Sequence, residues 1–211
     1  MIKVLITDDH AVVRKGLKQI IDETPGMLAA DEAASGNEAL EKIRKNEYDV
    51  VLLDISMQGK SGLDTLKELK LGRPGLPVLI LTIYPEEQYA LRVLKAGASG
   101  YLTKESAPEE LVTAIKKVSE GGRYISPSLA EKLAFNIGVD NTDIDPHERL
   151  SDREYQVMCM IASGKTVSEI ADEMSLSVKT ISTYRTRILE KMGMKNNAEM
   201  THYAIKKELV P

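Results

Sequence analysis

Five short apolar runs alternate with helix-like segments over the first 120 residues, and this alternation constrains the fold more than any other feature. The runs are IKVLIT (2–7), LAADEA (28–33), DVVLLD (49–54), PVLILT (77–82) and SGYLT (99–103). Apolar residues recur at three- and four-residue spacing in the segments between and after them, at 11–23, 37–45, 63–70, 86–97 and 108–120. Strands joined by helices form parallel sheets. We therefore predict an α/β domain with a five-stranded, parallel, doubly wound sheet.

The second half of the chain has a different pattern. Residues 126–136 are expected to form a short helix, and residues 136–149 have no sustained periodicity and carry four acids against one arginine. Such a stretch indicates an exposed linker. We predict that the first domain covers 1–122, the linker 123–149 and a second domain 150–211.

Every segment of the second domain has helical spacing. The expected helices cover 152–163, 167–174, 178–192 and 197–207. Only Ser-Leu-Ser (175–177) separates the middle two, which is the length of a helix-turn-helix connection. Capping boxes are predicted at four helix starts, where serine or threonine precedes glutamate by three residues: Ser35, Ser106, Ser151 and Thr166.

Composition limits the class of protein. A hydrophobic content of 43% with 28% charged residues is ordinary for a globular chain. No run approaches the ~20 apolar residues of a membrane span, and the N-terminus does not resemble a signal peptide. The single cysteine, Cys159, allows no intrachain disulfide. These features favour a cytoplasmic protein without membrane association.

Charged and hydroxylated residues gather where the predicted strands end. Asp8 and Asp9 follow the first strand, Asp54 ends the third, Thr82 ends the fourth and Lys104 follows the fifth. Ligands of doubly wound sheets bind at this edge. Three neighbouring carboxylates favour a hard cation such as Mg²⁺, and the set suits an aspartyl nucleophile that receives a phosphoryl group. Taken singly, each residue has a simpler interpretation as a helix cap, a turn residue or a solvent-facing lysine.

The first ~125 residues resemble the receiver domain of two-component response regulators, which has a flavodoxin-like fold. The resemblance rests on ITDDH, LLDISMQGKSGL, LILTIY and AGASGYLTKE. It implies that Asp54 is the phosphoacceptor and that Asp8, Asp9, Asp54 and the backbone carbonyl of Ser56 bind Mg²⁺. It also implies that Thr82 and Tyr101 are switch residues and that Lys104 contacts the phosphoryl group.

Two positions depart from the common receiver pattern. Gln58 stands where many receivers have proline, and Glu105 follows Lys104 where many have a proline with a cis peptide bond. A cis bond without proline costs ~3–4 kcal/mol. We nevertheless expect the Lys104–Glu105 bond to be cis, because that geometry would aim Lys104 into the site.

Positive charge in the second domain is concentrated on one predicted helix. Residues 150–211 have a net charge of +1, whereas 178–195 have five cations against one acid. A helical wheel places Val178, Ile181, Ile188, Leu189 and Met192 on a core-facing side. The residues expected to contact DNA bases or phosphates lie around the other side: Lys179, Ser182, Thr183, Thr186, Arg187 and Lys191. Arg185 lies near the apolar side and is expected to reach outward to phosphate. A solvated basic helix in an ordinary bundle is the alternative.

The run from Leu150 to Met194 resembles the LuxR-type helix-turn-helix of NarL/FixJ response regulators. Ser182 and Tyr184 replace the lysine and histidine of many relatives, so the base preference does not carry over. The two resemblances imply a DNA-binding transcriptional regulator, not an enzyme, that is phosphorylated on Asp54 by a sensor histidine kinase. Its partners would be promoter DNA and, once phosphorylated, a second copy of the chain. The alternatives are a receiver that works through protein contacts without phosphorylation and an aspartate-nucleophile phosphatase. The latter would need an acid at position 56.

Overall fold

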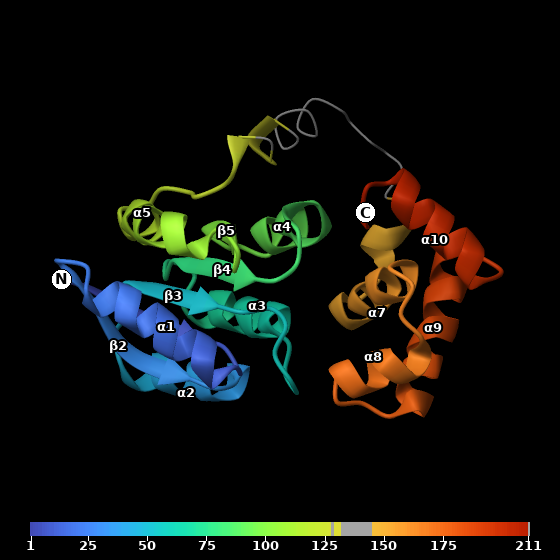
Figure 1. Cartoon of the computed structure of the whole chain (residues 1–211), viewed down its shortest axis with the longest axis horizontal. Helices are drawn as coiled ribbons and strands as arrows, with labels where there is room; N and C mark the ends of the chain where they lie inside the picture. The colour runs from blue at the N-terminus through green and yellow to red at the C-terminus, as the bar shows by residue number, and fades with distance from the viewer. Residues whose placement is uncertain (128, 132–144, 211) are drawn as a thin grey trace. The chain divides into compact units, whose positions relative to one another are not determined.

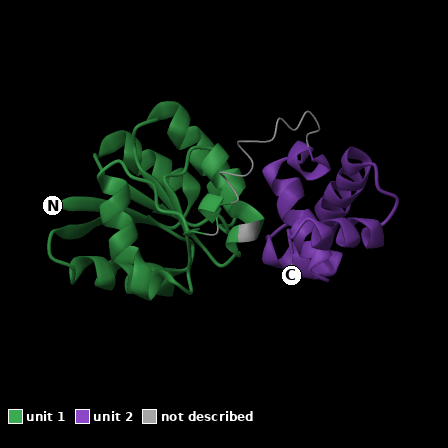
Figure 2. Cartoon of the chain, turned by 90° about the horizontal axis from the view of Figure 1, so that it is seen from above, with its two compact units in different colours: residues 1–132 green, residues 133–211 purple. Residues whose placement is uncertain are grey.

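The computed structural model describes residues 1–127, 129–131 and 145–210. The chain divides into two compact units, residues 1–132 and 133–211, which Figure 2 shows in different colours. Each unit is described here by itself. Residues 128 and 132–144 lie outside the described residues, and they include about half of the helix expected over 126–136 and about half of the expected linker.

The first unit contains a five-stranded parallel sheet with the order β2-β1-β3-β4-β5. The strands are β1 (Ile2–Thr7), β2 (Met27–Ala33), β3 (Val50–Leu53), β4 (Val78–Thr82) and β5 (Gly100–Thr103). All four pairings are parallel, so the carboxyl ends of the strands meet at one edge. The predicted fold class is confirmed, and the strand positions agree to within one residue at every end.

Helices cover both faces of this sheet (Figure 1). They are α1 (Ala11–Asp22), α2 (Gly36–Lys45), α3 (Gly62–Gly72), α4 (Glu86–Lys95) and α5 (Ala107–Ser119). The core beneath α1 and α5 contains Val4 and Ile6 of β1 together with Leu17 of α1 and Leu111 of α5. The central strand β3 is apolar throughout because helices cover it on both sides, and its four residues are at most 1% exposed.

The pairing of β1 with β2 contains an irregularity. Val4 pairs with Ala29, but Leu5 pairs with Asp31, so Ala30 is an extra residue on β2. Because one extra residue shifts the register, the side chains of β2 beyond the bulge lie on the other face of the sheet than in a regular pairing.

The segment after α5 remains attached to the sheet. Tyr124 forms an isolated parallel bridge with Gly100, and its carbonyl accepts a hydrogen bond from the Tyr101 amide at 3.0 Å. The Tyr124 hydroxyl donates to Glu110 at 3.0 Å.

The second unit is helical in its described residues. It contains a 3-10 turn (Pro146–Arg149) and the helices α7 (Asp152–Ala162), α8 (Val167–Glu173), α9 (Val178–Met192) and α10 (Asn197–Lys206). Ser151 and Thr166 form the predicted capping boxes. In the first unit, Ser35 caps α2 with its side chain, but the Glu38 carboxylate accepts from the Ala34 amide and not from the Ser35 amide, so only half of the predicted box forms. The prediction for Ser106 is wrong, because its backbone is already helical and its side chain makes no capping hydrogen bond. Within the described residues no helix combines the length and apolarity that a membrane span requires.

Candidate functional site

The carboxylate of Asp54 lies at the carboxyl end of β3 and is paired with Lys104. Lys104 Nζ lies 2.6 Å from Asp54 Oδ2 and 2.7 Å from Asp8 Oδ2. The backbone amide of Ser56 donates to Asp54 Oδ1 at 2.9 Å. Asp54 is only 1% exposed. The strand thus carries the acid to the edge of the sheet, as expected, but the carboxylate is buried there and not open to solvent.

Asp54 and Lys104 shift each other's pKa. Burial raises the pKa of Asp54, and the opposing effect of Lys104 offsets this only in part. Burial lowers the pKa of Lys104, but the Asp54 and Asp8 carboxylates outweigh it, so the net shift of the Lys104 pKa is upward. Lys104 is therefore a firmly held cation beside the phosphoacceptor candidate.

Glycine at position 62 allows the chain to pack closely against Asp54. A Cβ at Gly62, the first residue of α3, would lie 2.0 Å from the Asp54 carbonyl oxygen and 2.6 Å from the Ile55 Cα. Both atoms belong to the backbone, so any side chain here would displace the loop that carries the phosphoacceptor candidate. Gly62 is not among the site residues predicted from the sequence.

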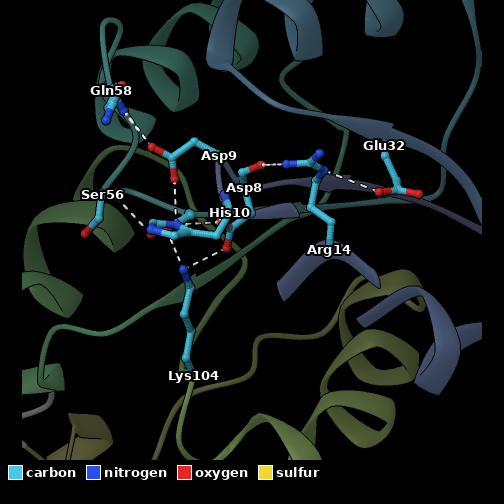
Figure 3. Close-up of polar contacts among 9 residues, drawn as sticks. Asp8, Asp9, His10, Arg14, Glu32, Ser56, Gln58 and Lys104 are labelled. Atoms are coloured by element: carbon cyan, nitrogen blue, oxygen red, sulfur yellow. Dashed lines mark hydrogen bonds and ion pairs between the residues drawn. The ribbon is translucent and has the colours of Figure 1, made fainter. Parts of the chain in front are cut away.

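Asp9 and His10 complete the acidic group (Figure 3). His10 Nδ1 lies 2.8 Å from Asp9 Oδ1 and 3.2 Å from Asp8 Oδ1. The second oxygen of Asp9 accepts a hydrogen bond from the Gln58 amide at 3.0 Å. His10 was not assigned a role from the sequence, although it directly follows the two acids. The donor is the backbone N–H of Gln58, which a proline would lack, so this contact depends on the departure from the common receiver pattern.

The donor set fits a hard divalent cation. One ligand atom from each of Asp8, Asp9, His10 and Asp54 lies within 4.8 Å of the others. Carboxylate oxygens are the ligands that Mg²⁺ prefers in proteins, so Asp8, Asp9 and Asp54 are the residues that would hold such an ion. The structure thus brings together the three acids predicted from the strand ends. For Ser56 it shows the amide contact with Asp54, while the role of the carbonyl stays a prediction.

The two switch candidates lie on neighbouring strands. Thr82 is fully buried at the end of β4, and its Oγ1 accepts a hydrogen bond of 3.4 Å from the Tyr84 amide. Tyr101 on β5 is 3% exposed, and its hydroxyl donates to the carbonyl of Tyr84 at 2.9 Å. Tyr101 thus already lies inward in this structure, where it holds the loop that follows Thr82.

The expectation of a cis bond before Glu105 is wrong. The residues that the structure describes contain no cis peptide bond, so Lys104–Glu105 is trans. Without proline the trans form is favoured by ~3–4 kcal/mol. The flexible lysine side chain reaches Asp54 without that cost.

Helix α9 exposes the predicted DNA-contact residues. Lys179, Ser182, Thr183, Thr186, Arg187 and Lys191 are all exposed, whereas Ile181, Ile188 and Met192 are buried. The Thr183 and Thr186 hydroxyls donate back to carbonyls one turn earlier, which leaves their oxygen lone pairs facing outward as acceptors.

Three side chains of α9 differ from expectation. Val178 is 50% exposed rather than core-facing, because it begins the helix beyond the packed part of the unit. Arg185 donates through Nε to Asn197 Oδ1 at 2.6 Å, which ties α9 to α10 instead of pointing the guanidinium freely outward. Lys191, which is predicted as a DNA contact, forms an ion pair within the unit, with its Nζ 2.6 Å from Glu154 Oε2.

Two family models match the chain. The response regulator receiver domain matches residues 4–116, which is more than half of the chain, and the luxR family of bacterial regulatory proteins matches residues 148–204. The chain is a two-component response regulator of the NarL/FixJ family. Its C-terminal unit is a LuxR-type DNA-binding domain.

Relatives match this regulator over nearly its whole length. It is 39% identical over 207 residues to response regulator UvrY of Escherichia coli K12, covering 98% of this chain and 94% of the relative. It is 38% identical over 210 residues to response regulator GacA of Pseudomonas aeruginosa, covering 100% and 98%. A solved structure of RcsB from Salmonella enterica serovar Typhimurium, bound to the promoter rprA in the presence of phosphomimetic BeF3-, is 27% identical with a TM-score of 0.63, covering 96% of this chain and 98% of RcsB.

Proposed function

We propose that Asp54 of this regulator accepts a phosphoryl group from a sensor histidine kinase and that this modification controls promoter binding by residues 150–211. The contact that carries the proposal is the one between Lys104 Nζ and Asp54 Oδ2, 2.6 Å apart beside Asp8. A lysine in this position neutralises charge on a group transferred to Asp54. The chain acts here as a phosphoryl acceptor rather than as an enzyme with a turnover substrate.

The transfer is a displacement at phosphorus. An oxygen of Asp54 forms the new P–O bond, while the P–N bond to the donor histidine breaks and its electron pair returns to the imidazole. Asp8, Asp9, Asp54 and the Ser56 carbonyl would hold Mg²⁺, which would supply charge neutralisation during the transfer. Ser56 holds the carboxylate through its amide, and the Thr82 hydroxyl retains a proton with which to donate to a phosphoryl oxygen.

The proposed response links Thr82 to the neighbouring loop. Phosphorylation draws the Thr82 hydroxyl toward the new oxygens, which changes the loop that Tyr101 holds through the Tyr84 carbonyl. Phosphorylated copies form a homodimer whose two C-terminal units match two DNA half-sites. In the proposed resting state, without the phosphoryl group, the receiver domain covers helix α9 and blocks its binding to DNA. A regulator with these partners acts in the cytoplasm.

The proposed DNA interface is the exposed side of α9. Lys179 and Arg187 neutralise backbone phosphates, and the Ser182, Thr183 and Thr186 hydroxyls lie at bases or phosphates. Lys191 belongs to the same side but also pairs with Glu154. RcsB, a chain similar to this one, has been solved bound to a promoter, which supports DNA binding by this chain.

Incubation with acetyl phosphate and Mg²⁺ tests the proposal. Wild-type protein is expected to gain one phosphoryl group by intact mass, and Asp54→Asn is expected to gain none. Asp49→Asn is the matched control, because Asp49 lies immediately before the same strand and makes only an edge contact with the Lys3 amide in the described structure. No gain in wild type, or an equal gain in Asp54→Asn, would contradict the proposal. The first of these results would favour a receiver that works through protein contacts alone. A phosphatase of the aspartate-nucleophile type has less support, since Ser56 stands where its second acid would be.

A further inference from the structure

The guanidinium of Arg14 connects residues 8–10, the acidic loop between β1 and α1, to two neighbouring elements. Its NH1 donates to the Asp8 carbonyl at 2.7 Å, and its Nε donates to Glu32 Oε2 at 3.3 Å (Figure 3). Arg14 belongs to α1 and Glu32 to β2, while Asp8 follows β1. The Arg14 side chain is 16% exposed, so it is largely covered. One side chain thus joins three elements directly behind the acids.

The bulge in β2 is what places Glu32 beside Arg14. The observed register pairs Glu32 with Ile6, and Ile6 faces the core beneath α1 and α5. A regular continuation from Val4 would have paired Asp31 with Ile6 and turned Glu32 to the other face of the sheet. In the bulged register Asp31 instead accepts a hydrogen bond from the Tyr48 hydroxyl at 2.7 Å. Bulges commonly re-aim a side chain beside a functional site.

The hydrogen bond to the Asp8 carbonyl fixes a part of the acidic loop that the sheet does not fix. The Asp8 amide donates to the Ala33 carbonyl at 3.1 Å, which is the last such contact along β1. The Asp8 carbonyl belongs to the rigid, planar peptide unit that also contains the Asp9 amide. Holding this carbonyl therefore sets the direction in which the chain presents both Asp8 and Asp9.

We propose that Arg14, aligned by Glu32, is a positioning residue that holds the Asp8–Asp9 peptide so that both carboxylates face a shared Mg²⁺. This inference rests on the proposed use of these acids as metal ligands. The planar guanidinium has several N–H donors in fixed directions, so arginine can reach the Asp8 carbonyl and Glu32 together. A lysine ammonium is a compact charge without this fixed arrangement of donors. Outer contacts of this kind typically change metal affinity 10- to 100-fold when removed.

A surface ion pair of the same residue types provides a matched control. Arg44 NH2 lies 3.2 Å from Glu68 Oε1, and their side chains are 70% and 43% exposed. This pair lies on α2 and α3 and touches none of the acids. Arg44→Ala removes the same kind of charge as Arg14→Ala without affecting the acidic loop.

The test is a Mg²⁺ titration of the full-length protein, followed by the amide NMR signals of Asp9, Ser56 and Gln58. Arg14→Ala is expected to raise the Mg²⁺ dissociation constant about 10-fold or more, and Arg14→Lys to recover it only in part. Glu32→Gln is expected to shift it in the same direction by less, and Arg44→Ala to leave it unchanged. In acetyl phosphate reactions the Mg²⁺ concentration for half-maximal rate should rise in parallel, while the rate at saturating Mg²⁺ changes less.

Distinct results separate this inference from the proposed function. Unchanged Mg²⁺ affinity in Arg14→Ala, or full recovery in Arg14→Lys, would overturn the positioning role while phosphorylation of Asp54 stands. Loss of affinity that merely follows loss of folding would appear as a lowered melting temperature together with collapse of all amide signals, and the milder Glu32→Gln variant then decides the matter. Failure of the wild-type protein to bind Mg²⁺ at all would overturn the metal site itself.

Discussion

Lys191 of α9 is paired with Glu154 of α7, with 2.6 Å between Nζ and Oε2. Glu154 is only 3% exposed and also accepts a hydrogen bond from the Ser151 amide at 2.8 Å as part of the capping box. The sequence predicts Lys191 as a DNA contact because it lies on the basic side of its helix. The structure gives this lysine a second role, since it neutralises a buried carboxylate at the start of another helix.

Lys191→Ala is expected to destabilise the DNA-binding domain by about 2 kcal/mol, because it leaves Glu154 buried without its cation. Lys179→Ala removes an exposed lysine of the same helix and should change the free energy of unfolding by less than about 0.5 kcal/mol. Urea unfolding followed by the amide signals of α7 and α9 measures both. Equal stability of the two variants would show that the contact with Glu154 contributes nothing.

The stability of the same domain should depend on pH through Glu154. Burial raises the pKa of this carboxyl, but the hydrogen bonds from Lys191 and from the Ser151 amide outweigh it, so the net pKa lies below the usual 4.5. A carboxyl with a lowered folded pKa contributes stability that is present above its unfolded pKa and is lost as the pH falls through the folded pKa. The melting temperature should therefore fall more steeply below about pH 4.5 in wild type than in Glu154→Gln. Parallel curves for the two proteins would contradict this.

The strands, the helices and the acid cluster were predictable from sequence because each depends on a strong local pattern. Val50 to Leu53 form an uninterrupted apolar run, and a strand covered on both faces buries such a run completely. Once the sheet is parallel, Asp8, Asp54 and Thr82 must meet at its carboxyl edge. Their convergence follows from topology rather than from any contact that the sequence displays.

Other features depend on tertiary geometry that leaves no local signal. The pairing of Arg14 with Glu32 requires one extra residue in the β1–β2 register. Nothing in LAADEA marks that bulge. Similarly, a helical wheel assigns Val178 to the core, but only the packing at the start of α9 shows that no neighbour covers it.

Lys104→Ala is expected to lower the free energy of unfolding of the receiver domain by about 3 kcal/mol in metal-free buffer, since it leaves two nearly buried carboxylates, Asp54 and Asp8, without a cation. Because Mg²⁺ would neutralise the same acids, millimolar Mg²⁺ should recover part of this loss. Thermal unfolding with and without Mg²⁺ measures both effects. A second variant, Lys104→Ala combined with Asp54→Asn, should be less destabilised than Lys104→Ala alone, and the opposite order would contradict the role of the pair.

Tyr101→Phe is expected to loosen the loop between β4 and α4 without disturbing the sheet. The ring remains to fill its buried place, but the hydrogen bonds from its hydroxyl to the carbonyls of Tyr84 and Pro85 are lost. The loss should cost about 1 kcal/mol. Hydrogen exchange should accelerate at residues 83–86 and stay unchanged in β4. Unchanged exchange in the loop would show that Tyr101 does not hold it.

The exposed residues of α9 should separate into two groups when DNA binding is measured at several salt concentrations. Lys179→Ala and Arg187→Ala each remove one phosphate-neutralising charge, so each should weaken binding to all sequences and reduce the slope of log K against log salt by about 1. Ser182→Ala removes no charge and should leave that slope unchanged while altering the preference among promoter sequences. Fluorescence anisotropy with phosphorylated protein and a panel of duplexes provides both quantities. A salt slope that is unchanged in Lys179→Ala and Arg187→Ala would place the DNA on another face of the domain.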